Sequence, residues 1–333
     1  MLDRPISIRD IAEEAGVSIA TVSRVINGKG RYSQETEVRI RKIIERHHYV
    51  PNVAAKSLKT NSYKLVGIVV PDITNEFFAR IVQIIQYHLI GLGYAAFICN
   101  TNEDPYLEDV QIDMMRSQNI AGIIYISGHL PVDRKLRNLP TVFIDRKPIN
   151  TETNAISVIE SDNQLGAQLA VREMHARGRR RIGIINAVMS SSTHNQRYDG
   201  YREALRDLGL DFQSDWHLQV QQVGYHEAFA VMSGFLEAGK VVDGLFCTTD
   251  WLAVGAIDAI RHHGLNVPKD ISVVGFDDIS IALYRSRPLT TIHQDISQLG
   301  ADAVDILMKL IANPTMTSVH KVIPVTLVKR ATT

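Results

Sequence analysis

The sequence predicts an α/β protein with a small helical head followed by two doubly wound parallel sheets. Three observations support this fold class. Residues 7–46 contain three amphipathic segments, each preceded by a residue that can cap a helix. From residue 64 onward, apolar strands alternate with amphipathic helices, which is typical of parallel sheets covered on both faces. About nine strands over roughly 270 residues suit two such sheets better than one.

The head is predicted to contain a helix-turn-helix. Ser7 opens the first helix as part of a capping box, and Gly16 ends that helix. Ser18 can cap a second helix that runs to Asn27, and Ser33 can cap a third. The second helix has an outward face of small and polar residues that ends in an arginine, which suits the major groove of DNA.

Residues 49–63 are predicted to be a linker because they are too few and too polar for a core of their own. Residues 52–59 combine good helix formers with two lysines and one large apolar side chain, Leu58. A helix of about two turns is unstable alone in water. We therefore expect this segment to fold on contact with a partner.

The body is expected to place polar loops at the carboxyl ends of its strands, where doubly wound sheets bind ligands. Strands are expected near residues 65–70, 94–99, 122–126, 141–144, 155–159, 181–185, 244–247, 272–276 and 322–328. Helices are expected near residues 76–91, 106–118, 162–177, 196–208, 225–237, 251–263 and 296–311. Several strands are followed by carboxylates, hydroxyls, an arginine or aromatic rings, namely Asp72, Thr74, Asn75, Phe77, Phe78, Asp145, Arg146, the run 190–193, Arg197, Asp250, Trp251, Asp277 and Asp278. This composition suits a polyhydroxylated small molecule.

Composition and charge exclude several other classes of protein. Hydrophobic residues make up 45% and charged residues 22%, and no apolar run approaches the ~20 residues of a membrane helix. We expect a cytoplasmic protein, because the start lacks the apolar segment of a secretory signal and two cysteines, Cys99 and Cys247, lie in apolar runs. Residues 1–62 hold 11 basic and 7 acidic residues, a charge of +4, against 25 and 29 in the rest, a charge of −4. A basic head points weakly to a polyanionic partner.

The motifs of common enzymes are absent. The sequence has no phosphate-binding GxxxxGK[ST], no GxGxxG and no metal-ligand spacing. The run 190–192 with His194 lacks the GxSxG elbow of a hydrolase, so a polar cleft loop explains it better. We therefore expect no catalytic residue, no metal and no cofactor.

These residues together resemble the lactose/galactose repressor (LacI/GalR) family of bacterial transcription regulators. The matching segments run in order from residue 7 to about residue 330. They are 8–12, 16–28, 49–52, 71–75 with Phe77 and Phe78, 162–163, 197–201, 275–278 and 288–292. The chain departs from the family pattern at 186–188 and at Arg179. The pocket shape at these positions and the identity of the ligand therefore stay open.

The resemblance implies the residues that contact DNA. Ile19, Ala20 and Arg24 would enter the major groove, where Arg is suited to guanine. Other residues would lie near phosphates, and Leu58 would be an apolar wedge in the minor groove, with Lys56 beside the backbone. The full implied set is Ser18, Ile19, Ala20, Thr21, Ser23, Arg24, Asn27, Asn52, Lys56 and Leu58.

The resemblance also implies the residues of an effector cleft. They are Asn75, Phe77, Phe78, Asp145, Asp162, Arg197, Asp250 and Asp277, with Arg146, Thr193, Gln219, Trp251 and Gln294 as weaker candidates. Purely structural roles stay open as alternatives to effector binding. They are a helix cap for Asp162, core packing for Phe77 and Phe78, and an ion pair between Arg197 and Asp277.

The implied domains are a helix-turn-helix DNA-binding domain at 1–48, a linker with a hinge helix at 49–63, and two subdomains of a periplasmic-binding-protein-like core. The first subdomain would comprise 64–161 and 293–320, and the second 162–292 and 321–333. The implied protein is a homodimeric repressor of a carbohydrate-utilisation operon that binds a palindromic double-stranded operator and a sugar-like effector. The alternatives are a purine or nucleoside effector, a phosphocarrier corepressor protein, a sugar-binding transport receptor and a sugar-modifying enzyme.

Overall fold

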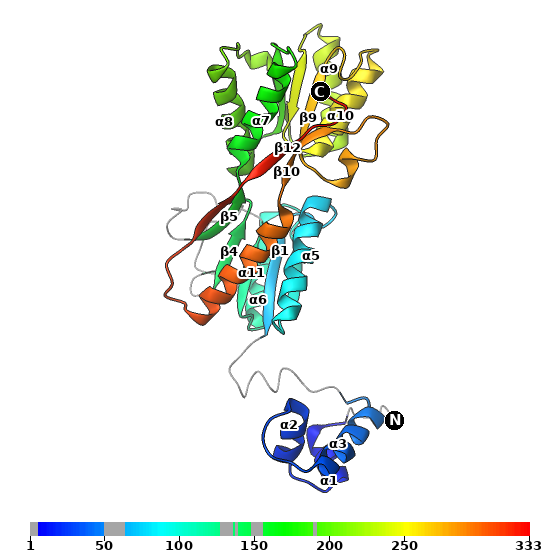
Figure 1. The fold of residues 1–333 in the computed structure, drawn as a ribbon, viewed down its shortest axis with the longest axis vertical. Helices are drawn as coiled ribbons and strands as arrows, with labels where there is room; N and C mark the ends of the chain where they lie inside the picture. Colours follow the sequence, from blue (N-terminus) through cyan, green and yellow to red (C-terminus); the bar gives the residue numbers. More distant parts are fainter. Residues whose placement is uncertain (1–5, 50–63, 127–135, 137–138, 148–155, 189–191) are drawn as a thin grey trace. The chain divides into compact units, whose positions relative to one another are not determined.

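The computed structural model describes residues 6–49, 64–126, 136, 139–147, 156–188 and 192–333. The chain divides into two compact units, Met1–Ser62 and Tyr63–Thr333 (Figure 1). The predicted hinge helix, with Asn52, Lys56 and Leu58, lies outside the described residues.

The first unit contains the three predicted helices, α1 (Ile8–Ala15), α2 (Ile19–Asn27) and α3 (Gln34–Arg46). Ser7 forms a capping box with Asp10, and Gly16 ends α1 in the left-handed conformation (φ 65°) that glycine adopts without strain. The helices enclose a small apolar core of Ile11, Ala12, Ala15, Val22, Val25, Ile40 and Ile43. The predicted helix-turn-helix is confirmed.

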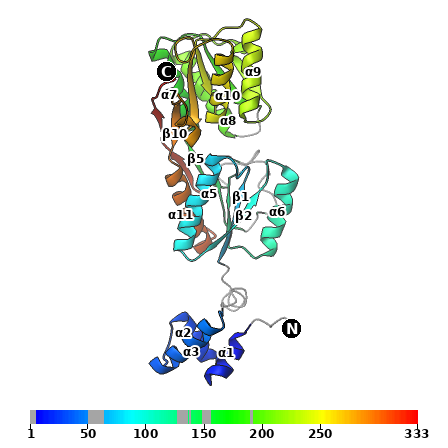
Figure 2. The same cartoon turned by 90° about the vertical axis from the view of Figure 1, so that its right-hand side faces the viewer.

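The first sheet of the second unit is parallel throughout, with strand order β11-β5-β4-β3-β1-β2. Its strands are β1 (Leu65–Val70), β2 (Ala95–Asn100), β3 (Gly122–Tyr125), β4 (Thr141–Ile144), β5 (Ser157–Ser161) and β11 (His320–Ile323). Helices α5 (Glu76–Gly91) and α11 (Ile296–Ala312) cover one face, and α6 (Pro105–Ser117) covers the other (Figure 2). The buried, Val- and Ile-rich strands form the cores on both faces.

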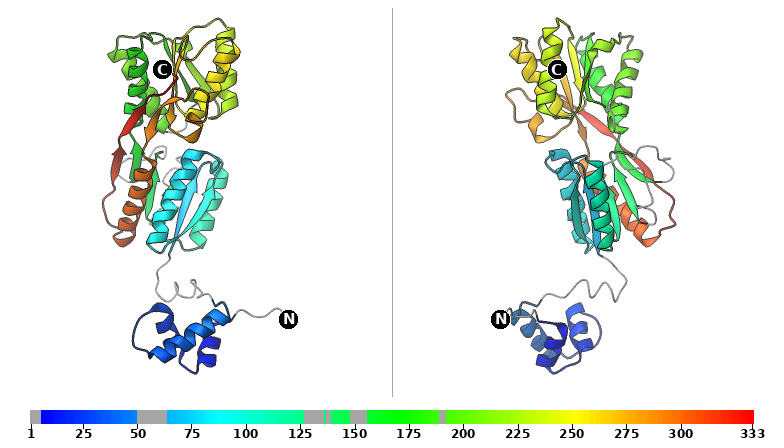
Figure 3. Two further views of the ribbon diagram at one scale, coloured as in Figure 1. Left: turned by 45° about the vertical axis from the view of Figure 1, so that its right-hand side comes forward. Right: turned by 180° about the vertical axis from the view of Figure 1, so that it is seen from behind.

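The second sheet has the strand order β12-β10-β9-β8-β6-β7, and only β12 runs antiparallel to its neighbour. Its strands are β6 (Ile182–Ala187), β7 (His217–Val220), β8 (Gly244–Cys247), β9 (Ser272–Asp277), β10 (Thr290–Gln294) and β12 (Val325–Val328). Helices α7 (Asn163–Ala176) and α8 (Ser192–Asp207) cover one face, and α9 (Tyr225–Glu237) and α10 (Asp250–His262) cover the other (Figure 3). Short 3₁₀ turns, η2 (Ser214–Trp216) and η3 (Ser280–Ala282), complete this half.

The chain passes between the two sheets three times: between β5 and α7, between β10 and α11, and between β11 and β12. The last two crossings were expected at 292/293 and 320/321, whereas β10 and β11 extend to Gln294 and Ile323. The single strand expected at 322–328 was wrong, because Pro324 separates two strands that belong to different sheets. β7 and β10 were not predicted.

Both cysteines are free and buried, as the sequence predicts. Within the described ranges, no group of three His, Cys, Asp or Glu side chains could hold a metal ion. No helix in that part of the chain is long and apolar enough to span a membrane.

Candidate functional site

The outward face of α2 presents the residues predicted to enter the major groove. Ile19, Ala20 and Arg24 lie on the face away from the core, while Val22 and Val25 on the other face are buried in the core of the head. This burial fixes which face of α2 points outward. Small side chains beside one arginine leave room for the helix to approach base edges, which the guanidinium can then contact.

The residues predicted to lie near phosphates also hydrogen-bond within α2. The Thr21 backbone N–H donates to Ser18 Oγ at 3.2 Å, and the two hydroxyls lie 2.9 Å apart. Asn27 Nδ2 donates to the Ser23 carbonyl at 2.7 Å. These bonds stabilise the two ends of the helix, and their contacts with DNA stay a prediction.

A cavity of about 410 Å³ lies at the carboxyl ends of strands from both sheets, where the sequence predicts a ligand site. Its walls come from loops after β1, β2 and β4 of the first sheet, from loops after β7 and β8 and the last residue of β9 in the second, and from the first turns of α5 and α8. All but three of the described lining residues are polar or charged. They are Asp72, Thr74, Asn75, Phe77, Phe78, Asn102, Glu103, Asp145, Arg146, Thr193, His194, Arg197, Gln222, Val223, Thr249 and Asp277.

Arg197 is a buried cation in the cavity wall. Its Nε donates to Asn163 Oδ1 at 2.8 Å, and its Nη1 donates to the Thr248 carbonyl at 2.5 Å. The same Nη1 lies 3.6 Å from Asp277 Oδ1, so the ion pair considered as an alternative from the sequence is present. The guanidinium also lies 3.6 Å from the centre of the Phe276 ring. These contacts hold Arg197 in one orientation at the cavity.

Burial changes the protonation of groups in the cavity wall. It raises the pKa of Asp277 to about 7, although the nearby Arg197 acts in the opposite direction. Burial also raises the pKa of Asp145. Burial, with the charges of Arg197 and Arg146, lowers the pKa of His194 to about 3, so this imidazole is neutral at pH 7. The cavity therefore contains neutral as well as charged hydrogen-bonding groups.

Backbone strain is present at both walls of the cavity. Asp145 (φ 64°) follows β4 and Asp277 (φ 113°) ends β9, and both have a positive φ although neither is a glycine. Such a conformation costs on the order of 1 kcal/mol or more and is often found at functional sites. The strain supports a functional role for these two carboxylates.

Eight of the thirteen predicted effector residues line the cavity: Asn75, Phe77, Phe78, Asp145, Arg146, Thr193, Arg197 and Asp277. Asn75 also caps α5, because its Oδ1 accepts a hydrogen bond from the Phe77 backbone N–H at 3.0 Å. Phe77 and Phe78 are 3% and 6% exposed and belong to the core of the first sheet as well. The two phenylalanines therefore line the cavity and also pack in the core, so the core-packing alternative is correct in part.

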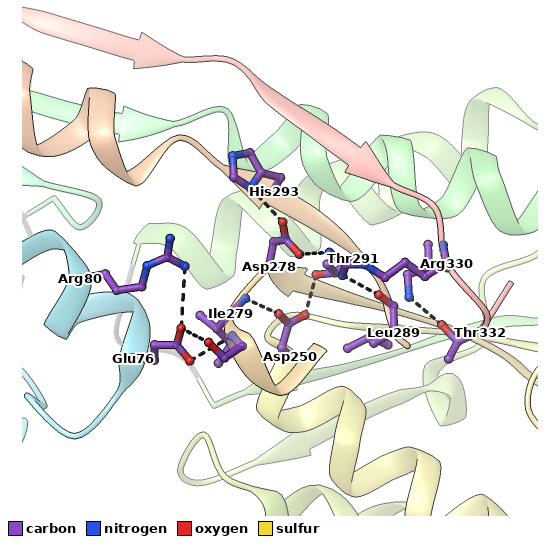
Figure 4. Close-up of polar contacts among 12 residues, drawn as sticks. Glu76, Arg80, Asp250, Asp278, Ile279, Leu289, Thr291, His293, Arg330 and Thr332 are labelled. Carbon is purple, nitrogen blue, oxygen red and sulfur yellow. Dashed lines mark hydrogen bonds and ion pairs between the residues drawn. The ribbon is translucent and has the colours of Figure 1, made fainter. Parts of the chain in front are cut away.

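Asp250 does not line the cavity, so its place in the predicted effector set is corrected. Its Oδ2 accepts a hydrogen bond from the Ile279 backbone N–H at 3.0 Å, and its Oδ1 accepts one from the Thr291 hydroxyl at 2.5 Å (Figure 4). Gln294 also lies behind the wall, where its Nε2 donates to Asp277 Oδ1 at 2.8 Å. Both residues position the end of β9, which carries Asp277.

Three further predicted residues also lie outside the cavity lining. Asp162 caps α7, because its Oδ1 accepts a hydrogen bond from the Leu165 backbone N–H at 2.9 Å. Gln219 is exposed on β7, and Trp251 is partly exposed in the first turn of α10. Asp162 therefore has the helix-capping role that the sequence analysis gave as its alternative.

Several lining residues were missing from the predicted set. Asn102 and Glu103 follow β2, and the polar loop after the expected strand 94–99 was a usable signal for them. Thr249 follows β8, another expected strand. Gln222 and Val223 follow β7, which is short and was not predicted, so no local pattern pointed to them.

The fold and the cavity define a class of protein: a DNA-binding regulator with a helix-turn-helix head and a two-sheet, ligand-binding body. Residues 7–52 match the family model of bacterial regulatory proteins, lacI family. Residues 171–333 match the model of the periplasmic binding protein-like domain. The chain belongs to the lacI family of bacterial transcription regulators.

Known proteins support this assignment over almost the whole chain. Proteins named HTH-type transcriptional repressor PurR from Pasteurella multocida (strain Pm70) and Histophilus somni (strain 129Pt) are 34% and 33% identical, and 92% of this chain and 92% of each relative are covered. The Lac repressor dimer bound to operator and the anti-inducer ONPF superposes with a TM-score of 0.90 at 27% identity, covering 99% of both chains. A complex of transcriptional regulator CelR with cellobiose superposes with a TM-score of 0.76 at 26% identity, covering 98% of this chain and 100% of that chain. The chain is thus a DNA-binding transcriptional repressor and not an enzyme.

Proposed function

We propose that this repressor is controlled by a small polyhydroxylated, sugar-like effector that binds in the cavity between the two sheets. The polar lining of the cavity carries this proposal. Asp145 is almost fully buried, and its Oδ1 has no hydrogen-bond partner among the described residues. A buried acceptor of this kind is costly unless a ligand hydroxyl donates to it. Arg197 and Asp277 add a fixed donor and a fixed acceptor on the opposite wall.

A second candidate effector is a purine base or nucleoside. The relatives at 33–34% identity are named PurR, a name that denotes a purine regulator. A flat base generally requires stacking on exposed aromatic faces. The described lining has two aromatic side chains, Phe77 and Phe78, which meet edge to face with ring centres 5.4 Å apart and are mostly buried. The chemistry of the wall therefore favours the polyhydroxylated ligand.

The proposed repressor acts as a homodimer on a twofold-symmetric operator. The similar Lac repressor structure is that of a dimer bound to operator. In this chain, an apolar surface over α5, β2 and α6 would suit a second copy. Its exposed side chains are Tyr87, Ile90, Leu92, Ile98, Tyr106, Val110 and Met114. Light scattering should give the mass of two 37.2 kDa chains, and Ile90→Glu should give the mass of one.

Control of operator binding is proposed to run through the linker at 49–63, most of which lies outside the described residues. Effector binding would change the relative arrangement of the two sheets and thereby the spacing of the two linkers. The linkers would order together in the minor groove with Leu58 as the wedge. A phosphocarrier corepressor protein is an alternative input.

A thermal-shift panel of free sugars, purine bases and nucleosides tests the proposal, because a ligand that binds the native state raises the melting midpoint. We expect a free sugar to raise the midpoint of the full chain. Asp145→Asn should remove most of that rise, whereas Asp211→Asn, at an exposed position outside the cavity lining, should retain it. A rise given only by purines would favour the second candidate, and a rise unchanged in Asp145→Asn would contradict binding in this cavity.

A further inference from the structure

The described lining of the cavity has no excess positive charge with which to bind a phosphate group. Four carboxylates, those of Asp72, Glu103, Asp145 and Asp277, face two guanidinium groups. Burial raises the pKa of Asp145 and of Asp277 and so favours the protonated form of each carboxyl. Even with both carboxyls protonated, the formal charge of the lining is 0 and does not become positive. A phosphate ester would add about −1.5 to −2.

Both guanidinium groups also donate hydrogen bonds to groups of the protein. Arg146 Nη1 donates to Glu103 Oε1 at 2.8 Å, and the Arg146 side chain is only 9% exposed. Arg197 donates to Asn163 and to the Thr248 carbonyl and lies beside Asp277. Tight phosphate recognition by arginine generally uses two parallel N–H donors of one guanidinium. Glu103 therefore takes Nη1 of Arg146, and the contacts of Arg197 take its Nε and Nη1.

Two helix N-termini at the cavity, those of α5 and α10, are capped by side chains. The Phe77 backbone N–H at the start of α5 donates to Asn75 Oδ1. The Leu252 backbone N–H at the start of α10 donates to Thr249 Oγ1 at 3.3 Å. Side-chain caps therefore already take one first-turn N–H group of α5 and one of α10.

The loop after β2 holds Glu103 in a defined place opposite Arg146. Asn102 (φ 51°) and Glu103 (φ 56°) both adopt the left-handed conformation, which is uncommon for consecutive residues that are not glycine. The loop is tied to the end of β1, because the Thr101 backbone N–H donates to the Val70 carbonyl at 2.9 Å. A loop that keeps this conformation at the cavity directs a carboxylate to the Arg146 guanidinium.

The atoms left without a partner suit an uncharged ligand. In the described part of the chain, Asp145 Oδ1 is a buried acceptor and Arg146 Nε a buried donor, and neither has a hydrogen-bond partner. One acceptor and one single donor match a hydroxyl group, which both donates and accepts. They do not match the three acceptor oxygens of a phosphate group.

We propose that Glu103 is a specificity-determining residue that restricts this cavity to uncharged effectors and excludes their phosphorylated forms by neutralising Arg146. This inference rests on the proposed function, because it assigns a ligand class to the same cavity. Removing the Glu103 charge would free Arg146 Nη1 and move the charge of the lining by +1. An anion would then gain both a bidentate partner and a more favourable field.

The test measures binding of inorganic phosphate to the full chain by isothermal titration calorimetry. Three proteins are compared: the wild type, Glu103→Gln, and the control Glu237→Gln, which alters an exposed glutamate of α9 outside the cavity lining. We expect Glu103→Gln to bind phosphate about tenfold more tightly than the other two proteins. The gain should disappear in Glu103→Gln combined with Arg146→Gln. Tryptophan fluorescence of each variant verifies the native fold.

A second arm compares glucose with glucose 6-phosphate and adenosine with its 5′-monophosphate. We expect the wild type to bind the phosphorylated member of each pair more weakly than the free member. In Glu103→Gln, the ratio of the two dissociation constants should move closer to one. Tighter binding of a phosphorylated member by the wild type, or unchanged phosphate affinity in Glu103→Gln, would overturn the inference. If neither free compound binds while Glu103→Gln still gains phosphate affinity, the proposed choice of effector fails and the role of Glu103 stands.

Discussion

Replacement of Asp277 by Asn should remove a pH dependence from the stability of the second sheet. Burial raises the pKa of Asp277 from 3.8 to about 7 in the folded protein. The folded state therefore holds this proton more tightly than the unfolded chain does. The resulting stabilisation is complete below about pH 4 and is lost as the pH rises through about 7. Asn resembles the protonated carboxyl in shape but does not titrate, so the variant lacks this contribution.

The difference between the two pKa values sets the size of the effect. One pKa unit corresponds to about 1.4 kcal/mol, so a rise from 3.8 to about 7 corresponds to roughly 4 kcal/mol. The free energy of unfolding of the wild type should fall relative to that of Asp277→Asn by up to this amount between pH 4 and pH 7. Burial and the charge of Asp277 also raise the pKa of Asp250, so the two carboxyls titrate together and the difference reports on the pair.

Urea unfolding followed by tryptophan fluorescence measures this difference. Both tryptophans of the chain, Trp216 and Trp251, lie in the half that contains Asp277, so the signal reports on the relevant part. The control Asp211→Asn alters an exposed aspartate of the same half and should follow the wild-type profile. Parallel profiles of the wild type and Asp277→Asn over this pH range would refute the raised pKa.

Three further predictions concern the head, the cavity edge and the packing of the second sheet. Arg24→Ala should lose about 1–3 kcal/mol of base discrimination in competition with altered DNA, with Arg39→Ala as the control; an equal loss on every sequence would show a phosphate contact only. Glu76→Ala removes hydrogen bonds that the Ser280 N–H and hydroxyl of turn η3 donate to α5 at 3.0 and 2.6 Å, so calorimetry should show effector binding weakened about three- to tenfold; unchanged affinity would contradict this. Gly200→Ala places a Cβ 2.2 Å from the Gln164 carbonyl oxygen and should lower the free energy of unfolding by about 1–3 kcal/mol, whereas Gly234→Ala, with open space around it, should not; equal stability of the two variants would argue against the close α7–α8 contact.

The elements that the sequence predicted well are those with strong local signals. Ser7, Ser18 and Ser33 each cap a helix of the head, and each was visible as a hydroxyl before an amphipathic run. β10 was missed because Thr290 and Thr291 are polar by type, yet both are fully buried. The buried Thr291 hydroxyl donates a hydrogen bond to Asp250. This partner is 41 residues away in the sequence, so no local pattern could indicate it.

The candidate site was predicted where it follows from topology and missed where it follows from side-chain pairing. The carboxyl ends of parallel strands placed Asp145, Arg197 and Asp277 together, and the structure has all three in the cavity lining. The same rule selected Asp250, which points instead at the loop after β9. A residue at a strand end can face the ligand or the backbone behind it, and only the packed structure distinguishes the two.

The most direct test of the proposed control is whether operator and effector change each other's affinity by the same factor. Fluorescence anisotropy gives the affinity for a palindromic duplex selected from random DNA, with and without the sugar identified in the thermal-shift panel, and calorimetry gives the sugar affinity with and without that duplex. We expect the ratio of the two operator affinities to equal the ratio of the two sugar affinities and to differ clearly from one, as linkage requires. A chain that lacks residues 1–62 should lose DNA binding and retain sugar binding. A sugar that binds in the cavity and leaves the operator affinity unchanged would contradict the proposed control.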